Sequence, residues 1–106
     1  MKLTIWYMRP EFFSDGIMGF DHLKKHGIVP DPKNLNKTHI LLKIIVANDL
    51  EDAYSSMQGE NWSPNGEARD LILSRGLRHT SMCVGDIAVY ETGIVWMVDI
   101  FGFKEI

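Results

Sequence analysis

Few residues of this chain have the types and the spacing that catalysis would require. His79 lies two positions before Ser81, and a histidine beside a hydroxyl could act as general base to a nucleophile in a hydrolase or nuclease. Nearby carboxylates could replace the serine in acid–base chemistry. The serine is not part of a G-x-S-x-G turn, and no glycine-rich loop that binds nucleotide phosphates occurs. We therefore assign no catalytic residue, and a small hydrolase or nuclease is the third of three hypotheses.

Two histidines have a spacing that suits a metal ion. His22 and His26 lie four residues apart, which on a helix places both imidazole rings on one face, as a zinc pair requires. A third ligand, such as His39, His79 or Asp21, would have to come from elsewhere, and no H-E-x-x-H motif is present. We expect a solvated helix face here, and neither a metal ion nor another cofactor.

Two further features have simpler structural explanations. Gly16-Ile17-Met18-Gly19 matches the G-x-x-G loop with which KH domains hold a nucleic-acid backbone, but Asp15 precedes it and the nearest lysines come later. A turn is its expected role. Cys83, the single cysteine, stands among apolar residues and is expected to be a buried, unreactive thiol. One cysteine also excludes an intramolecular disulfide.

Aromatic and arginine residues, which anchor many protein interfaces, gather in two segments. Tyr7 and Arg9 lie in the first, and Trp62, Asn65 and Arg69 lie in the second. Loops often carry recognition residues, so the second segment is the expected recognition site. Burial of the tryptophans in the core is the alternative. The leading hypothesis is a non-enzymatic protein that binds a protein partner through these two surfaces.

Charge is unevenly distributed along the chain. Residues 1–43 hold seven lysines and arginines against four acids, whereas residues 44–106 hold four against ten. The second hypothesis is therefore nucleic-acid binding, with Lys24, Lys25, Lys33 and Lys37 on backbone phosphates. The formal net charge of −3 argues against it, because nucleic-acid-binding domains are usually basic.

Length and composition indicate one globular domain that spans residues 1–106. The chain has 106 residues, of which 45% are hydrophobic and 24% charged. No apolar run approaches the ~20 residues of a membrane-spanning helix, and the first residues lack the features of a secretion signal. A cytoplasmic location is expected.

Periodicity predicts an α+β fold with the order β-α-β-α-α-β-β and helices packed on a mainly antiparallel sheet. Strands are predicted at residues 2–8, 38–47, 82–90 and 94–101, and helices at 20–26, 48–57 and 63–75. The strand at 2–8 is apolar on both faces, which indicates a central place in the sheet. Gly85-Asp86 predicts a bulge or turn, and Glu91-Thr92-Gly93 predicts a tight hairpin. Strand 94–101 is expected at an edge, where it could pair two copies into a homodimer.

The C-terminal quarter of the chain resembles a known domain. His79-Thr80-Ser81-Met82-Cys83-Val84-Gly85-Asp86-Ile87 is followed by Trp96-Met97-Val98-Asp99 and Gly102-Phe103-Lys104-Glu105-Ile106, in the order and spacing of the YodL-like domain. The resemblance covers residues 79–106. His79, at its start, joins the aromatic and arginine residues above as a candidate binding residue.

This resemblance implies a biological setting. YodL-like domains are found on plasmids, phages and integrative conjugative elements, often near counter-defence or transfer genes, and no catalytic residue can be carried over from them. The whole chain is also similar to small accessory proteins of proteobacterial mobile elements. We therefore expect an accessory protein of a mobile genetic element that binds a host protein or one encoded by the element.

Overall fold

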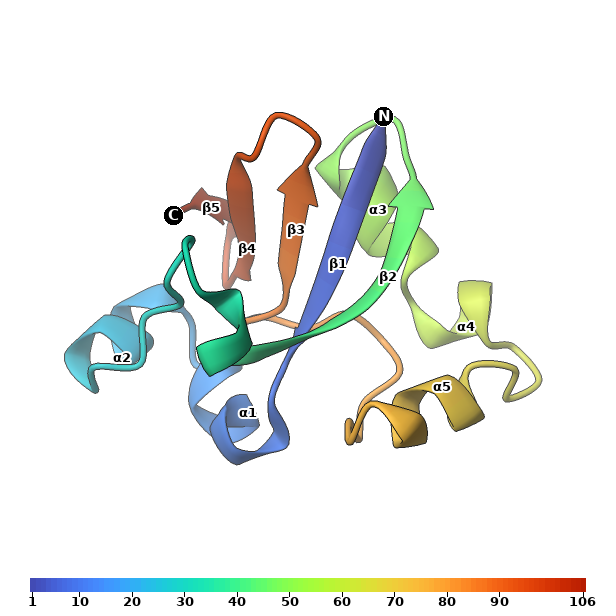
Figure 1. Cartoon of the computed structure of the whole chain (residues 1–106), viewed down its shortest axis with the longest axis horizontal. Coiled ribbons are helices and arrows are strands. Elements are labelled where there is room, and N and C mark those ends of the chain that lie inside the picture. The colour runs from blue at the N-terminus through green and yellow to red at the C-terminus, as the bar shows by residue number, and fades with distance from the viewer.

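The computed structural model describes residues 1–106 as one α+β domain built on a five-stranded antiparallel sheet (Figure 1). The strand order is β2-β1-β3-β4-β5. The strands are β1 (Lys2–Met8), β2 (His39–Val46), β3 (Ile87–Tyr90), β4 (Val95–Asp99) and β5 (Gly102–Glu105). β1 pairs with β2 on one side and β3 on the other, which confirms its predicted central place. The predicted fold class is therefore confirmed.

The helices are short and pack on both faces of the sheet. They are α1 (Pro10–Gly16), α2 (Phe20–Lys25), α3 (Leu50–Ser56), α4 (Gly59–Trp62) and α5 (Arg69–Ser74), with a 3-10 turn η1 at Leu35–Lys37. Figure 1 shows α3 behind the strands. No helix is both long enough and apolar enough to span a bilayer.

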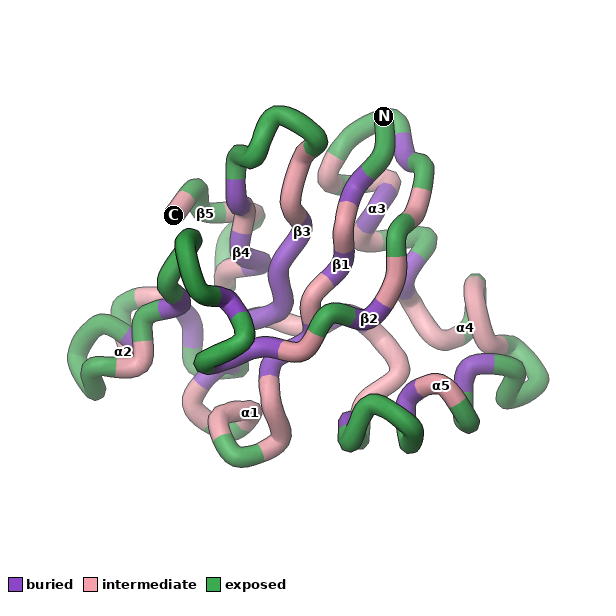
Figure 2. Tube along the Cα trace, in the orientation of Figure 1, coloured by how far each residue is buried: buried purple, intermediate pink, exposed green.

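Alternate residues of β1 enter two separate cores. Leu3, Ile5 and Tyr7 are fully buried among residues of α3 and α5. Met8 lies in the second core with Leu23 of α2 and residues of η1 and β4. The buried stretches follow the middle of the sheet in Figure 2, and the helix and loop exteriors are exposed. This two-sided burial explains why the β1 sequence is apolar on both faces.

The predicted start of the helix after β2 is confirmed by its hydrogen bonds. Asp49 is the N-cap of α3, and its carboxylate accepts a hydrogen bond from the backbone amide of Asp52 at 2.8 Å. The Asp52 carboxylate in turn accepts from the backbone amide of Asn48 at 2.8 Å. These bonds satisfy amides that the first helical turn leaves unpaired.

The structure has two helices, α1 and α4, and one strand, β5, beyond the predicted elements. α1 was not predicted: Pro10 follows the strand predicted at 2–8 and suits the end of a strand, but proline also suits the first position of a helix. The helix expected from Ser63-Pro64 begins only at Arg69. Ser63 instead follows α4, and its hydroxyl accepts a hydrogen bond from the amide of Ala68 at 2.9 Å. Gly66, with φ +85°, turns the chain between the two helices.

The C-terminal strands also differ from the prediction. The strand expected from residue 82 begins at Ile87, because residues 83–86 form the turn predicted at Gly85-Asp86. β5 was not predicted, and it covers β4, so residues 94–101 do not form an edge strand. The edges are β2 and β5. Pairing of two copies would therefore have to use another strand, such as β2, on which Ile44 and Val46 are 65% and 76% exposed.

Candidate functional site

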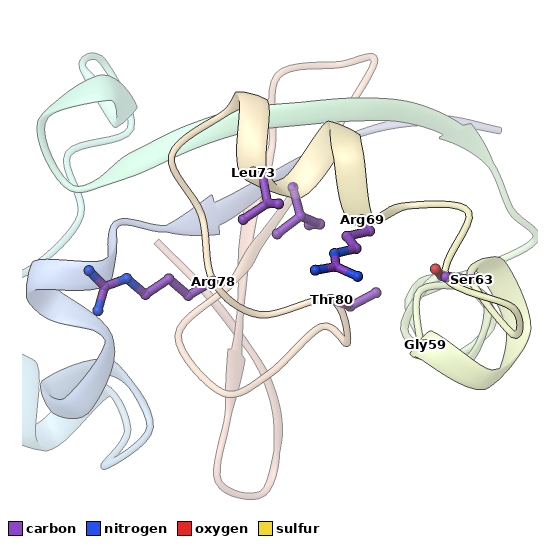
Figure 3. A pocket seen from close by; sticks show the side chains of 8 residues that line it. Gly59, Ser63, Arg69, Leu73, Arg78 and Thr80 are labelled. Carbon is purple, nitrogen blue, oxygen red and sulfur yellow. The ribbon is translucent and has the colours of Figure 1, made fainter.

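A pocket of about 420 Å³ opens between α4, α5 and the loop that follows α5 (Figure 3). In Figure 3 the Arg69 guanidinium extends toward Thr80, and the Arg78 side chain points away along the loop. The lining residues are Gly59, Ser63, Gly66, Arg69, Ile72, Leu73, Arg78 and Thr80. No carboxylate lines this pocket, although the chain has 14 acidic residues and 11 lysines and arginines. We call it the Arg69 pocket.

Trp62 stands beside the Arg69 pocket and is held on two sides. Its indole Nε1 donates a hydrogen bond to the carbonyl oxygen of Thr80 at 3.0 Å. The Lys43 ammonium lies 4.9 Å from the centroid of its ring. The side chain is half-buried and packs against the larger core. Trp62 therefore combines the two predicted roles, since it packs on the core and borders an exposed surface.

The structure separates the other candidates of this segment. Arg69 is exposed and lines the pocket. Asn65 is exposed but does not line it, because its backbone amide and side-chain Nδ2 both donate to the Glu67 carboxylate, at 2.9 and 3.1 Å. These hydrogen bonds, the backbone one above all, lower the pKa of Glu67. Asn65 shapes the exposed loop beside the site.

The prediction that Tyr7 contributes to a binding surface is wrong. Its side chain is 0% exposed, and its hydroxyl donates to the carbonyl oxygen of Thr80 at 2.7 Å. Burial, and to a lesser degree the nearby charges of Asp86 and Cys83, raise the pKa of Tyr7. Arg9 is half-buried, donates from Nε to the carbonyl oxygen of Asn36 at 2.9 Å, and lines neither pocket described here. The first segment thus positions other parts of the molecule.

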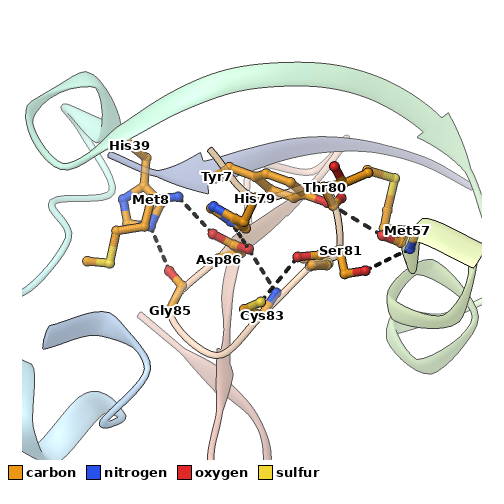
Figure 4. A network of polar contacts seen from close by, with 12 residues as sticks. Tyr7, Met8, His39, Met57, His79, Thr80, Ser81, Cys83, Gly85 and Asp86 are labelled. Carbon is orange, nitrogen blue, oxygen red and sulfur yellow. Dashed lines mark hydrogen bonds and ion pairs between the residues drawn. The ribbon is translucent and has the colours of Figure 1, made fainter. Parts of the chain in front are cut away.

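The residue at the centre of the polar network is Asp86, for which the sequence pattern predicts only a place in a bulge or turn (Figure 4). Its side chain is 0% exposed. Oδ1 accepts a hydrogen bond from the backbone amide of Met8 at 2.7 Å. Oδ2 accepts from the backbone amide of Cys83 and from His79 Nε2, both at 2.8 Å. One carboxylate therefore joins β1, the 83–86 turn and the His79 ring. The available signal was an acidic residue within an apolar run, seven positions after a histidine.

Asp86, Tyr7 and Phe13 hold the His79 ring in place. Its ring stacks on Tyr7 with centroids 4.5 Å apart and lies 4.6 Å from the Phe13 centroid. It lines a second pocket of about 270 Å³ with Pro10, Phe13, Ser14 and Arg78, which we call the His79 pocket. Arg78 lines both pockets, so they adjoin along the loop. Arg78 was not predicted, although it directly precedes a candidate residue.

Ser81 and His79, the residues of the hydrolase hypothesis, are not hydrogen-bonded to each other. Ser81 Oγ accepts a hydrogen bond from the backbone amide of Gly59 at 2.8 Å, while His79 pairs with Asp86. The thiol of Cys83 donates to the carbonyl oxygen of Ser81 at 3.2 Å, and burial, followed by the charge of Asp86, raises its pKa to about 11. Very little thiolate is therefore present at neutral pH.

The remaining candidates lie outside the two pockets. The rings of His22 and His26 are 4.2 Å apart, and His22 Nε2 lies 3.0 Å from the Asp15 carboxylate. No group of three or more His, Cys, Asp or Glu side chains is placed to hold a metal ion. Lys24, Lys25, Lys33 and Lys37 are exposed on α2 and around η1.

His39 and the Gly16–Gly19 segment have structural roles. His39 is fully buried, and its ring nitrogens lie 2.7 Å from Thr38 Oγ1 and from the carbonyl oxygen of Gly85. Burial lowers the pKa of His39. Gly16 ends α1, and Gly19, with φ +96°, is the N-cap of α2. The G-x-x-G segment is thus a turn between two helices, as expected.

Comparisons with known proteins give no indication of the function of this chain. No family model, no curated protein and no solved structure matches this chain. The resemblance of residues 79–106 to the YodL-like domain stays a prediction. The two adjoining pockets and the residues that hold them are the candidate site.

Proposed function

We propose that this chain is a non-enzymatic interaction module that binds an acidic segment of a protein partner in the Arg69 pocket. The observation that carries the proposal is the lining of that pocket: Arg69 extends its guanidinium into it, Ser63 and Thr80 also line it, and no carboxylate does, in a chain whose net charge is −3. Arginine binds carboxylates through paired hydrogen bonds. An acidic segment would meet a local positive charge with no carboxylate in the lining to oppose it.

Apolar lining residues favour a peptide as the occupant. Ile72 and Leu73 contribute hydrocarbon surface to the Arg69 pocket, and Trp62 stands beside it. Aromatic and arginine side chains in a partly desolvated pocket are the usual anchors of protein interfaces. An acidic segment with interspersed apolar residues would satisfy both kinds of surface. The resemblance to the YodL-like domain supports a setting on a mobile genetic element, where the partner would be a host or element-encoded protein.

Direct binding of an acidic peptide tests this proposal. The probe is a short fluorescein-labelled peptide of alternating glutamate and leucine, titrated with the full-length protein and followed by fluorescence anisotropy. We expect Arg69→Ala to weaken binding about tenfold, which corresponds to one lost charged contact. Binding should also weaken as salt is added.

Arg75→Ala is the matched control. Arg75 is an exposed arginine at the end of the same helix, and it does not line the pocket. Its replacement should leave the affinity within about twofold of wild type, since distant surface charges are screened. Equal losses in the two variants, or equal binding of a lysine–leucine peptide, would contradict the proposed site.

A further inference from the structure

We propose that the His79 pocket receives a phosphoryl group carried by a side chain of the same acidic segment. This inference rests on the proposed function, because the two pockets share Arg78. It names the partner more closely, as a segment that contains a phosphorylated residue.

The orientation of the His79 ring is fixed by its contacts. Nε2 donates to the Asp86 carboxylate, and the ring is held between Tyr7 and Phe13. Nδ1 has no hydrogen-bond partner in the protein, yet it is not among the buried, unpartnered polar atoms, of which Trp96 Nε1 is the sole example. Nδ1 is therefore within reach of solvent on a ring that lines the pocket. The ring cannot turn away without losing its bond to Asp86.

The His79 pocket is lined by polar side chains that suit an anion. The Ser14 hydroxyl, the Arg78 guanidinium and the His79 ring contribute the polar side chains of this pocket, and no carboxylate lines it. A phosphate monoester carries about −1.5 to −2 charges and three strong acceptor oxygens, which several donors can share. The Ser14 hydroxyl and the Arg78 guanidinium can donate to the phosphoryl oxygens, and Asp86 holds the His79 ring beside them.

The Arg69 pocket and the His79 pocket adjoin along residues 78–80. Residues 78–80 follow one another in the chain, and Arg78 and Thr80 line the Arg69 pocket while Arg78 and His79 line the other. A segment lying along this loop would place acidic and apolar side chains in the first pocket and a phosphorylated one in the second. A nucleotide is less suited, because Phe13 already packs on His79 and Lys43 covers a face of Trp62. These contacts occupy ring faces on which a base would stack.

Three peptides that differ at one position test the inference. A labelled acidic peptide carries serine, glutamate or phosphoserine at that position, and each is titrated with wild-type protein by fluorescence anisotropy. We expect the phosphoserine peptide to bind at least about tenfold more tightly than the serine peptide, because it adds two or more charged hydrogen bonds. The glutamate peptide should gain much less, since a carboxylate carries one negative charge where a phosphate monoester carries about −1.5 to −2.

Variants assign that gain to the pocket. Ser14→Ala, an exposed position whose replacement should leave the fold intact, should reduce the gain from phosphorylation several-fold. His79→Gln should remove most of it, and Arg69→Ala should weaken all three peptides in proportion. In wild-type protein the phosphoserine peptide should also shift the Nδ1 resonance of His79 in ¹⁵N-edited NMR spectra.

The outcomes separate the two proposals. If the acidic peptides bind and depend on Arg69 but phosphorylation gives no gain, the present inference is wrong and the proposed function stands. If no acidic peptide binds, both fail. Tighter binding of a 5′-phosphorylated oligonucleotide than of the phosphopeptide would also overturn the inference.

Discussion

Replacing Asp86 by asparagine exchanges one carboxylate oxygen of a fully buried side chain for an NH₂ group. The wild-type carboxylate accepts three hydrogen bonds, from the amides of Met8 and Cys83 and from His79 Nε2. Asparagine has one acceptor oxygen, so its NH₂ group must face at least one of these donors. A backbone N–H then remains without an acceptor at a site that solvent does not reach.

The expected loss is large for a domain of this size. A hydrogen bond to a charged group contributes about 1.5–3 kcal/mol, and a buried donor left without a partner costs about 1–3 kcal/mol. The two effects overlap, and we expect Asp86→Asn to lower the free energy of unfolding by about 2–4 kcal/mol. Small domains are stable by only about 5–15 kcal/mol in total.

Chemical denaturation at neutral pH, followed by circular dichroism, measures this loss. Asp70→Asn is the control, because Asp70 is an exposed acid in the first turn of α5 and its replacement should change stability by less than about 0.5 kcal/mol. Hydrogen exchange adds a local measurement, since the amide protons of Met8 and Cys83 should exchange faster in the variant than the loss of global stability requires. An Asp86→Asn protein as stable as wild type would refute the view that this carboxylate holds the loop to the sheet.

Three further predictions concern other parts of the molecule. Trp62→Phe should cost about 1 kcal/mol more than Trp96→Phe in chemical denaturation, because Trp62 Nε1 donates a hydrogen bond and the buried Trp96 Nε1 has no partner. Gly85→Ala should cost about 2–4 kcal/mol, since Gly85 has φ +101° and an added Cβ would lie 3.0 Å from the backbone of α1, whereas Gly27→Ala, at φ +70° in open space, should cost about 1 kcal/mol. Burial lowers the pKa of His39 below its ordinary value of 6.5, so the stability that neutral His39 contributes is complete above pH 6.5 and is lost as the pH falls below it. Denaturation curves across that range should show a smaller loss in His39→Gln than in wild type.

Local sequence patterns predict β1 and the start of α3. The alternation in β1 indicates a strand buried on both faces, and Asp49 at the start of an apolar helical stripe marks the beginning of α3. Pro10 fits both the end of a strand and the first position of a helix, so α1 was missed. β5 is four residues long and mostly exposed, and it pairs only with β4, which leaves little local pattern to detect.

The site was predicted only where residue type was sufficient. Trp62 and Arg69 were selected because their types anchor interfaces, and they do border or line the larger pocket. Tyr7 has the same character but is buried, which depends on the strands on both sides of it. Asp86 binds a residue 78 positions away, and no spacing rule detects such a partner.

The loop of residues 76–86 lines both pockets and is held in position by contacts with other elements. Residues 76–86 form neither helix nor strand, and apart from the turn that ends α5, the backbone hydrogen bonds that tie them to other elements lie at residues 82–86. Before that, the Thr80 carbonyl accepts hydrogen bonds from Tyr7 of β1 and Trp62 of α4, and the amide of Gly59 donates to Ser81. Asp86 fixes the far end of the same loop to β1. A loop held this way loses little conformational entropy on binding, which favours affinity from few contacts. In the proposed interaction, Tyr7 and Trp62 would contribute by fixing the backbone from which Arg78 and His79 project.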